Sequence, residues 1–322
     1  MKKMTLIIIV GVGIVLILVG VFFLLKNTTE KKAQYPEETI EIESIGTSDE
    51  EIILDDEKIF SSGDYQYYNV EATNVSVPTF ISKLNIKLIR EETGVENVKR
   101  WVKDTSYVSY DLTSNYLQFE FSTPIPSTSD LTSSKGVSDW IYENLKLELA
   151  CKIDNVFQSG SFQYVYANIL LEDTTVDFKG RDDKFSLFFI LNSRGDIKSG
   201  GLLLLDIAKE KYMLPLIDYN YLQSVINEEI YPKEIFSDFG SISDTLELSY
   251  ISNDWEKIEE SLDNCNVTEG KVIYYYSDNE QRYLLPVYKL QSFCEVTYQE
   301  EIYIVPSTIY TNAVSPEYIS AE

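Results

Sequence analysis

Residues 271–305 read KVIYYYSDNEQRYLLPVYKLQSFCEVTYQEEIYIV, and this stretch decides which kind of fold the chain can form. It divides into three runs rich in β-branched and aromatic residues, Lys271–Ser277, Arg282–Phe293 and Tyr298–Val305, separated by polar turns. Pro286 has no backbone donor, so its run is expected to form an edge strand or to carry a bulge. The pattern predicts an antiparallel meander near the C-terminal end.

Tyrosines are concentrated in this meander and alternate between the two faces of its strands. They are Tyr274, Tyr275, Tyr276, Tyr283 and Tyr288. Tyrosine rings can line a groove for a glycan or a peptide, or they can pack against a half-buried sheet. We expect most of these rings to pack. We also expect an open sheet edge at Tyr283, Pro286 and Tyr288, where a partner polypeptide would add a strand.

The three cysteines show no C-x-x-C spacing, which argues against a zinc or redox motif. Cys265 and Cys294 flank adjacent β structure and form the favoured candidate pair for a disulfide, although sequence alone does not determine connectivity. Cys151 closes an amphipathic stretch and is expected to be a buried thiol.

The sequence before the meander alternates between helical and strand-like patterns. Residues 76–93 are expected to form a helix with Ser76 as its cap, and residues 137–151 a second helix. Other segments predict strands at Tyr107–Leu112, Tyr116–Phe121, Phe162–Leu171, Phe185–Leu191, Gly201–Ala208 and Leu246–Ile251, and short helical segments at Asp218–Glu229 and Asp254–Leu262. The prediction is an α+β fold of mixed antiparallel sheets with a few short helices. A Pro/Ser/Thr loop at Thr123–Lys135 is expected to divide it into halves, 58–136 and 137–322.

A polar turn between two of the expected strands contains the tripeptide Arg194-Gly195-Asp196. Displayed on a hairpin, this tripeptide could act as a weak adhesion motif. The ordinary interpretation is turn chemistry, because Gly and Asp are common at hairpin tips. We expect the turn role.

The N-terminal region predicts a membrane anchor. Residues 6–25, LIIIVGVGIVLILVGVFFLL, carry no charge and would span about 30 Å as a helix, the hydrocarbon thickness of a bilayer. No A-x-A-like cleavage pattern follows, so residues 1–26 are expected to be an uncleaved single-pass signal anchor. Long domains translocate largely regardless of their charge, which places the N-terminus in the cytoplasm and the rest of the chain outside the cell membrane.

The charge of the chain limits its partners. It has 52 acidic and 27 basic residues and a formal net charge of −25, which argues against nucleic acid. Residues 27–57 are rich in acidic residues, Thr and Ser, and are expected to form a disordered stalk. The chain has no histidine, which excludes Ser-His-Asp and Cys-His catalysis and histidine metal sites. No cofactor fingerprint or metal-ligand spacing is present, so we expect neither cofactor nor metal.

The segment from Phe185 to Tyr318 resembles a family of bacterial proteins. It runs FSLFFILNSRGDIKSGGLLLL, then MLPLIDYNYLQSVI, KVIYYY, YLLPVYKL and EIYIVPSTIYTNAVSPEYI. This arrangement is similar to PepSY-like and YycH/YycI-like extracytoplasmic modules at the end of single-pass membrane proteins. The residues that carry the resemblance are Pro286, Val287, Tyr288, Ala313, Val314, Pro316, Glu317 and Tyr318. The resemblance implies a module used for regulation, inhibition or binding, without catalysis.

Together these features predict a membrane-anchored, extracytoplasmic, non-catalytic binding or regulatory protein. Its expected partners are the bilayer, through residues 6–25, and a protein or cell-wall component. One alternative is a cell-surface glycoside hydrolase, which needs only two carboxylates. Another is a structural component of the envelope.

Overall fold

The described residues form mostly β-sheet, with 62% strand and 14% helix, so the predicted α+β class is wrong. The computed structural model describes residues 40–42, 51–54, 63–73, 75–91, 95, 97–178, 186–228, 233–237, 262–277, 281–298 and 301–321. These residues belong to one compact unit, Pro36–Glu322. The prediction erred because several periodic segments form only short helices, while the strands around them are longer than their apolar patterns suggest.

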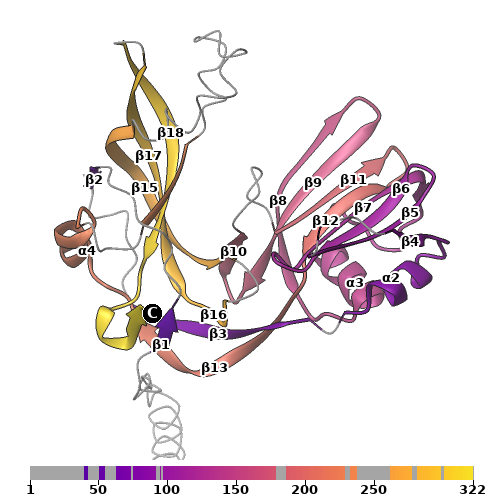
Figure 1. Cartoon of the computed structure of the whole chain (residues 1–322), viewed down its shortest axis with the longest axis horizontal. Helices are drawn as coiled ribbons and strands as arrows, with labels where there is room; N and C mark the ends of the chain where they lie inside the picture. The colour runs from indigo at the N-terminus through magenta and orange to yellow at the C-terminus, as the bar shows by residue number, and fades with distance from the viewer. Residues whose placement is uncertain are drawn as a thin grey trace, which may run out of the picture. The chain divides into compact units, whose positions relative to one another are not determined.

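Eight antiparallel strands form the first half of the main sheet (Figure 1), and we call them the helix-backed sheet. Its spatial order is β8-β9-β11-β12-β7-β6-β5-β4. The strands are β4 (Ile89–Glu91), β5 (Val98–Lys103), β6 (Ser106–Asp111), β7 (Tyr116–Ile125), β8 (Ala150–Ser159), β9 (Phe162–Leu171), β11 (Leu187–Asn192) and β12 (Ile197–Leu203). Short turns join most neighbours, so few residues are needed to position each strand.

Two helices, α2 (Val77–Lys83) and α3 (Ser134–Leu145), cover one face of this sheet (Figure 1). The side chains of Ser76 and Ser133 cap them by accepting hydrogen bonds from backbone N–H groups in the first turn. Helix α2 ends ten residues before the predicted limit, because Asn85 adopts a left-handed conformation with φ of 54°. The chain then enters β4 in place of the helix predicted as far as residue 93.

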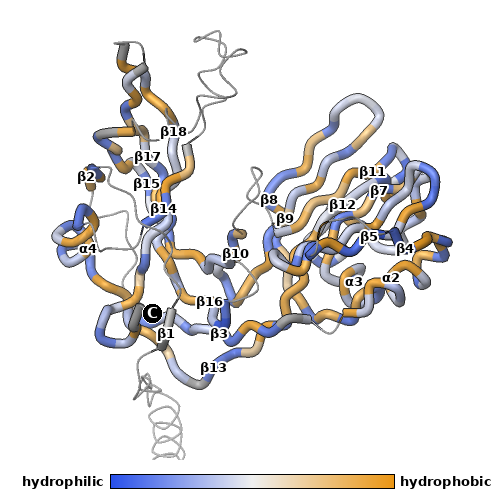
Figure 2. Tube along the Cα trace, in the orientation of Figure 1, coloured by the Kyte–Doolittle hydropathy of each residue, from blue (hydrophilic) through white to orange (hydrophobic). Residues whose placement is uncertain are grey.

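The core of the helix-backed sheet is built of large aromatic rings. Trp140 of α3 meets Phe189 of β11 edge-on at 5.1 Å between ring centroids, and Phe80 of α2 lies 5.8 Å from Phe119 of β7. All four are at most 3% exposed. Figure 2 shows hydrophobic residues in both helices and in the strands above them. Helix packing therefore buries one face of the sheet, and no helix among the described residues covers the other face.

The second half of the main sheet is the predicted meander, with the order β14-β18-β17-β15. Its strands are β14 (Lys233–Ser237), β15 (Leu262–Tyr276), β17 (Pro286–Tyr298) and β18 (Glu301–Asn312). Strand β10 (Thr174–Phe178) joins the two halves, because it pairs with β9 antiparallel and with β15 parallel. Helix α4 (Tyr219–Val225), capped by Asp218, contributes Leu222 to a core shared with the meander.

A smaller three-stranded sheet has the order β13-β3-β16. It consists of β3 (Asp64–Ala72), β13 (Leu205–Pro215) and β16 (Tyr283–Leu284). Strand β1 (Ile40–Ile42) pairs in parallel with β19 (Ile319–Ala321), which follows the short 3-10 helix at Pro316–Tyr318.

Part of the predicted stalk is ordered, which corrects the expectation for residues 27–57. Strand β2 (Ile52–Leu54) pairs in parallel with β15, and Ile52 and Leu54 are at most 5% exposed. Strand β1 also lies within this range. The isoleucines among the acidic residues supply enough apolar surface for these short segments to join a sheet. The mean composition of residues 27–57 therefore did not reveal these strands.

The expected anchor at residues 6–25 lies outside the described residues, as do the strand at 246–251 and almost all of the helical segment at 254–262. Within the part of the chain that the structure describes, no helix has the length and apolarity required to span a bilayer. The division into halves at residue 136 stays a prediction. Residues from both sides of it, such as Phe119 and Trp140, share one core.

Candidate binding surfaces

The predicted cysteine pair forms a disulfide between neighbouring strands. Cys265 of β15 and Cys294 of β17 are bonded, and both are fully buried. They pack with Leu290 and Ile309 in the core beneath the meander. Cys151 of β8 is a buried free thiol, and burial raises its pKa to about 11, which keeps it protonated and unreactive at neutral pH.

The structure does not place Pro286 and Tyr288 at an open edge. Pro286 is the first residue of β17, a position that proline tolerates, and β17 lies between β15 and β18. Tyr288 is 1% exposed, and its hydroxyl donates to the carbonyl of Ile217 at 2.8 Å. Tyr283 pairs with Asn69 of β3. Pro286 and Tyr288 therefore lie in an interior strand, whereas Tyr283 lies on β16, the last strand in the order β13-β3-β16.

The Arg194-Gly195-Asp196 tripeptide forms a self-contained turn between β11 and β12. The carboxylate of Asp196 accepts a hydrogen bond from the Asn192 side chain at 2.9 Å and pairs with Arg194 at 3.2 Å. Gly195 has φ of +83°, a conformation that favours glycine. The Arg and Asp side chains neutralise each other, so the geometry matches the turn interpretation.

A buried cluster of charged residues and tyrosines crosses the meander. Lys289 of β17 forms an ion pair with Asp177 of β10, and the hydroxyl of Tyr310 donates to the same carboxylate at 3.1 Å. The hydroxyl of Tyr275 donates to Glu234 at 2.9 Å, and the rings of Tyr275 and Tyr310 stack at 4.6 Å. We call these five residues the tyrosine–carboxylate cluster. They tie four strands, β10, β15, β17 and β18, to β14.

Burial and electrostatics keep the two tyrosine hydroxyls of this cluster protonated. Burial, and then the neighbouring carboxylates Glu234 and Asp177, raise the pKa values of Tyr275 and Tyr310 far above the ordinary value. Both hydroxyls therefore remain donors. Asp177 is 2% exposed and already has an ion-pair and a hydrogen-bond partner. The cluster is suited to holding strands together, since a substrate would have to break these contacts to reach the carboxylate.

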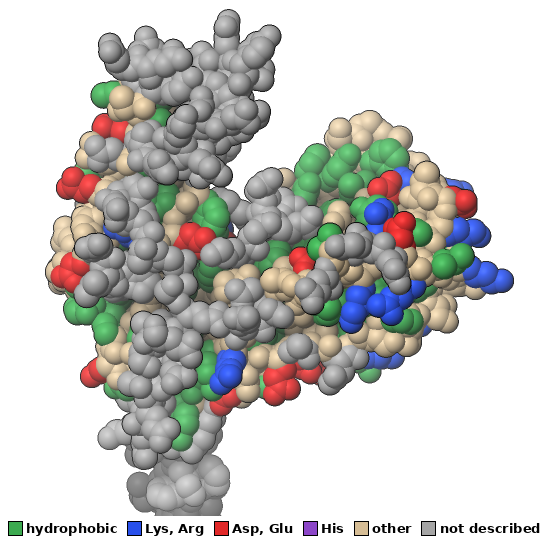
Figure 3. All heavy atoms as spheres, viewed as in Figure 1, with side chains coloured by type: hydrophobic (Ala, Val, Ile, Leu, Met, Phe, Trp, Pro, Cys, Tyr) green, Lys and Arg blue, Asp and Glu red, His purple; other side chains and the backbone are tan. Residues whose placement is uncertain are grey.

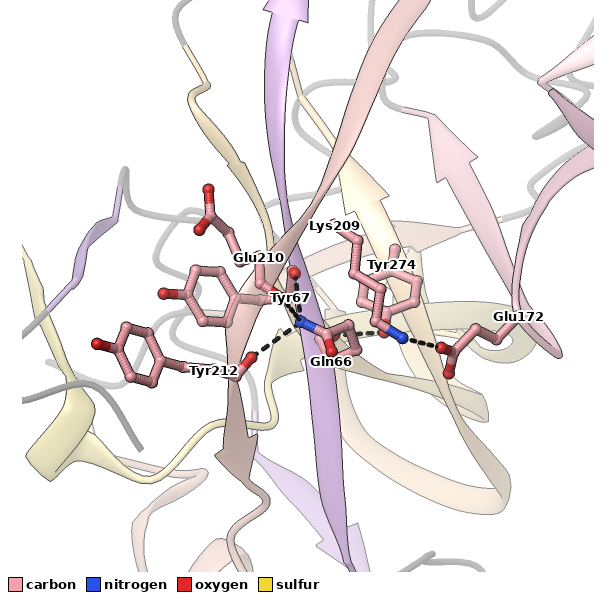
Figure 4. Close-up of polar contacts among 7 residues, drawn as sticks. All are labelled: Gln66, Tyr67, Glu172, Lys209, Glu210, Tyr212 and Tyr274. Atoms are coloured by element: carbon pink, nitrogen blue, oxygen red, sulfur yellow. Dashed lines mark hydrogen bonds and ion pairs between the residues drawn. The ribbon is translucent and has the colours of Figure 1, made fainter. Parts of the chain in front are cut away.

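A second internal network surrounds Gln66 of β3 (Figure 4). Its side-chain amide donates to the carbonyls of Glu210 at 2.6 Å and Tyr212 at 2.9 Å, where the pairing of β13 with β3 shifts register. The hydroxyl of Tyr274 donates to the Gln66 carbonyl at 2.5 Å. The Gln66 side chain thus supplies hydrogen bonds to carbonyl groups of β13 that do not pair with β3 at this irregularity. This network also has a structural role.

The helix-free face of the helix-backed sheet carries a ladder of aromatic rings at its β8–β9 end. Phe157 stacks on Tyr164 at 5.1 Å and on Tyr166 at 5.9 Å, with interplanar angles of 4° and 19°. Phe157 is 42% exposed, and the two tyrosines are partly exposed. Figure 3 shows hydrophobic side chains gathered over this part of the molecule. We call Phe157, Tyr164 and Tyr166 the aromatic ladder.

Polar and charged groups follow the ladder across the same face toward β4. Lys198 donates to the carbonyl of Phe121 at 2.6 Å and pairs with Glu120 at 3.3 Å. The guanidinium of Arg100 lies 5.0 Å from the centre of the Tyr107 ring. A face with aromatic rings at one end and charged groups at the other can hold a polypeptide through both contact types.

Sequence reasoning missed the ladder, the tyrosine–carboxylate cluster and the Gln66 network. The alternation of Phe162, Tyr164 and Tyr166 along one strand could have indicated a row of aromatic rings on one face. The other two depend on pairings between strands far apart in the sequence. Among the described residues, no group of three or more Cys, Asp or Glu side chains could hold a metal ion.

No protein-family model matches the chain, and no curated protein matches it. Among solved structures, an uncharacterized protein from Eubacterium rectale is similar, with 7% identity, a TM-score of 0.38 and coverage of 78% of this chain and 84% of that one. The Bacillus megaterium YpeB C-terminal domain is similar with 11% identity, a TM-score of 0.26 and coverage of 72% and 98%. These likenesses assign neither family nor function, so the resemblance to PepSY-like and YycH/YycI-like modules stays a prediction.

Proposed function

We propose that this protein is a non-catalytic binding protein that holds a partner polypeptide on the helix-free face of its helix-backed sheet. The observation that carries the proposal is the one-sided cover of that sheet. Helices α2 and α3 bury one face, while the other presents the stacked, partly exposed rings of the aromatic ladder. Partly exposed aromatic rings that are already ordered by stacking give contact area at a small entropic cost.

The distribution of carboxylates supports binding over hydrolysis. A glycoside hydrolase needs two carboxylates facing a sugar, one of them free to donate a proton. In the tyrosine–carboxylate cluster, Asp177 is buried against Lys289 and Tyr310. On the helix-free face, Glu120 and Glu91 pair with Lys198 and Arg100. Each of these carboxylates already contacts a cationic side chain, so a sugar could reach it only by breaking that ion pair.

The proposal includes a location. Residues 6–25 would anchor the chain in the cell membrane, and the binding unit would lie on the extracytoplasmic side, where membrane tethering raises its concentration near a partner. Protease added to intact cells should then trim the protein to a short anchored fragment. Complete protection from protease in intact cells, with cleavage after lysis, would show the opposite orientation.

Photo-crosslinking in cells tests the proposed face. A photoreactive residue is placed at Phe157 in the full-length chain, and a second variant carries it at Tyr142 of α3, which is 48% exposed on the helix side. We expect position 157 to crosslink to a discrete polypeptide that mass spectrometry can identify. The same polypeptide should not be crosslinked from position 142. Equal crosslinking from both positions, or turnover of a glycan by the purified chain, would contradict the proposal.

A further inference from the structure

We infer that β4 is a docking edge for an extended acidic segment of a partner polypeptide, which adds to the sheet as a strand. The inference rests on the proposed function and specifies the chemistry of the segment that binds. Strand β4 ends the order of the 14-stranded sheet and pairs with β5 alone among the described strands. Its outer side therefore offers backbone groups to an incoming strand.

Basic side chains are concentrated beside this edge, although the chain as a whole is strongly acidic. Residues 83–103 contain six Lys or Arg residues and three Glu residues, against 27 basic and 52 acidic residues in the whole chain. Figure 3 shows Lys and Arg side chains gathered over the part of the molecule where β4 and β5 lie. The local excess of positive charge is opposite in sign to the net charge of −25.

The register of the two strands places three of these cations on the face of the edge that bears the buried Trp101 and the helices, opposite the face that carries Ile89. Arg90 of β4 is paired with Trp101 of β5, and Lys99 and Lys103 lie two residues to either side of Trp101. All three basic residues are exposed. Diagonal neighbours on paired strands have Cβ atoms roughly 7–8 Å apart, so their charges repel each other when no anion lies between them. We call Arg90, Lys99 and Lys103 the basic triad.

The other face of the same edge is apolar at its first position. Ile89 is 74% exposed, the highest value among the large hydrophobic residues of the described chain that are exposed, and it pairs with the partly buried Val102. A strand added to β4 would place alternate side chains on opposite faces. Acidic residues would then meet the basic triad, and aliphatic residues would cover Ile89.

This combination favours a polypeptide over a polyanion such as polyphosphate. A polyanion would use only the three cations, whereas an extended peptide would also use the strand edge and the exposed isoleucine. The chain itself contains a segment with the required alternation, EETIEIES at residues 37–44. Within it, β1 already forms a parallel strand pair with β19, so this type of sequence forms strands in this protein.

Fluorescence anisotropy with a labelled EETIEIES peptide and the purified full-length chain tests the inference. Saturable binding that weakens with added salt is expected. The Lys99→Glu/Lys103→Glu variant should bind at least about tenfold more weakly. The matched control is Lys152→Glu/Lys271→Glu, which makes the same charge change at exposed lysines on β8 and β15 and should bind within about twofold of the unchanged chain.

Two further probes separate the ligand classes. The same peptide with alternate backbone amides N-methylated keeps its charge but cannot pair with an edge, so it should not bind. Inorganic polyphosphate should compete only weakly. Equal binding of the methylated peptide, strong competition by polyphosphate, or no loss in the Lys99→Glu/Lys103→Glu variant would overturn the inference. If crosslinking from position 157 still captures a polypeptide in that case, the proposed function stands and the β4 edge alone is excluded.

Discussion

The two halves of the main sheet bury their side chains and hold their strands together in different ways. The helix-backed sheet covers one face with α2 and α3 over an aromatic core, and leaves the opposite face partly exposed. The meander packs the short helix α4 against part of its core, and a disulfide, an ion pair and tyrosine–carboxylate hydrogen bonds also hold its strands. The first half presents the partly exposed aromatic ladder on one face, whereas the buried side chains of the second half mainly contact one another across its strands.

The largest effect should come from the aromatic core of the helix-backed sheet. Phe119→Ala removes a ring that contacts Phe80, Phe121 and Trp140 and should lower the free energy of unfolding by roughly 3–5 kcal/mol. Urea unfolding followed by circular dichroism measures the loss. A loss below about 1 kcal/mol would show that this half does not depend on its core packing.

In the meander, the largest effect should come from charge. Lys289→Met leaves Asp177 buried without its cationic partner and should cost about 3–4 kcal/mol. The double variant Lys289→Met/Asp177→Leu removes both charges and should recover much of that loss, because paired burial costs more desolvation than its attraction returns. The same urea titration compares the three chains. If the double variant is less stable than the single one, packing and not charge pairing holds these strands.

Removing the disulfide should destabilise the meander somewhat less. Replacement of Cys265 and Cys294 by Ala opens a link between residues 29 apart in sequence and should cost about 2–4 kcal/mol. Comparing oxidised and reduced forms of the unchanged chain gives an independent value, with Cys151→Ala as the control for the third cysteine. An unchanged midpoint after reduction would show that the link contributes nothing.

Alkaline pH should affect the meander more than the helix-backed sheet. Buried tyrosines with a raised pKa lie mainly in the meander and in β3, and the helix-backed sheet contributes Tyr110. The others are Tyr67, Tyr68, Tyr274, Tyr275, Tyr288 and Tyr310. Burial raises the pKa of Tyr67 to about 12, so its contribution is present below pH 10 and is lost as the pH rises toward 12.

Urea titrations between pH 9 and 12 measure this effect. Each raised tyrosine makes unfolding release about one proton in that range, so stability should fall steeply as the pH rises. Tyr67→Phe should reduce the slope by about one proton, while Tyr142→Phe, an exposed control on α3, should leave it unchanged. A slope that is the same in all three chains would contradict the assigned pKa increase.

The smallest effect should come from the turn at Arg194-Gly195-Asp196. Gly195→Ala places a side chain at φ of +83° and should cost about 1 kcal/mol by urea unfolding. Asp196→Ala removes the contacts to Asn192 and Arg194 and should change stability by a similar amount, without altering attachment to cells. Loss of attachment with unchanged stability would restore the adhesive interpretation.

The sequence predicted the strands of the meander, the cap of the first helix at Ser76 and the residues of the disulfide. These features depend on local patterns. Tyr288 and Pro286 were expected at a sheet edge because proline lacks the backbone N–H that an interior strand uses for pairing. In the structure, Pro286 is the first residue of an interior strand. The sequence prediction extended the first helix past Asn85, since apolar spacing does not reveal a left-handed residue.

The pairings that form the internal polar networks could not be derived from local patterns. Asp177 and Lys289 are 112 residues apart, and Gln66 and Tyr274 are 208 residues apart. Only the order of strands brings them together, and strand order is not visible in periodicity. The basic residues at 83–103 were visible in the sequence, but their position on one face of an edge depends on the pairing of β4 with β5.

Hydrogen–deuterium exchange of the full-length chain, with and without saturating EETIEIES peptide, tests the central contrast most directly. The account predicts slower exchange of backbone amides in β4 and β5 on peptide addition, and unchanged exchange in β15, β17 and β18. Slower exchange in the meander with none in β4 and β5 would contradict the account, because the half described as internally occupied would then be the one that binds.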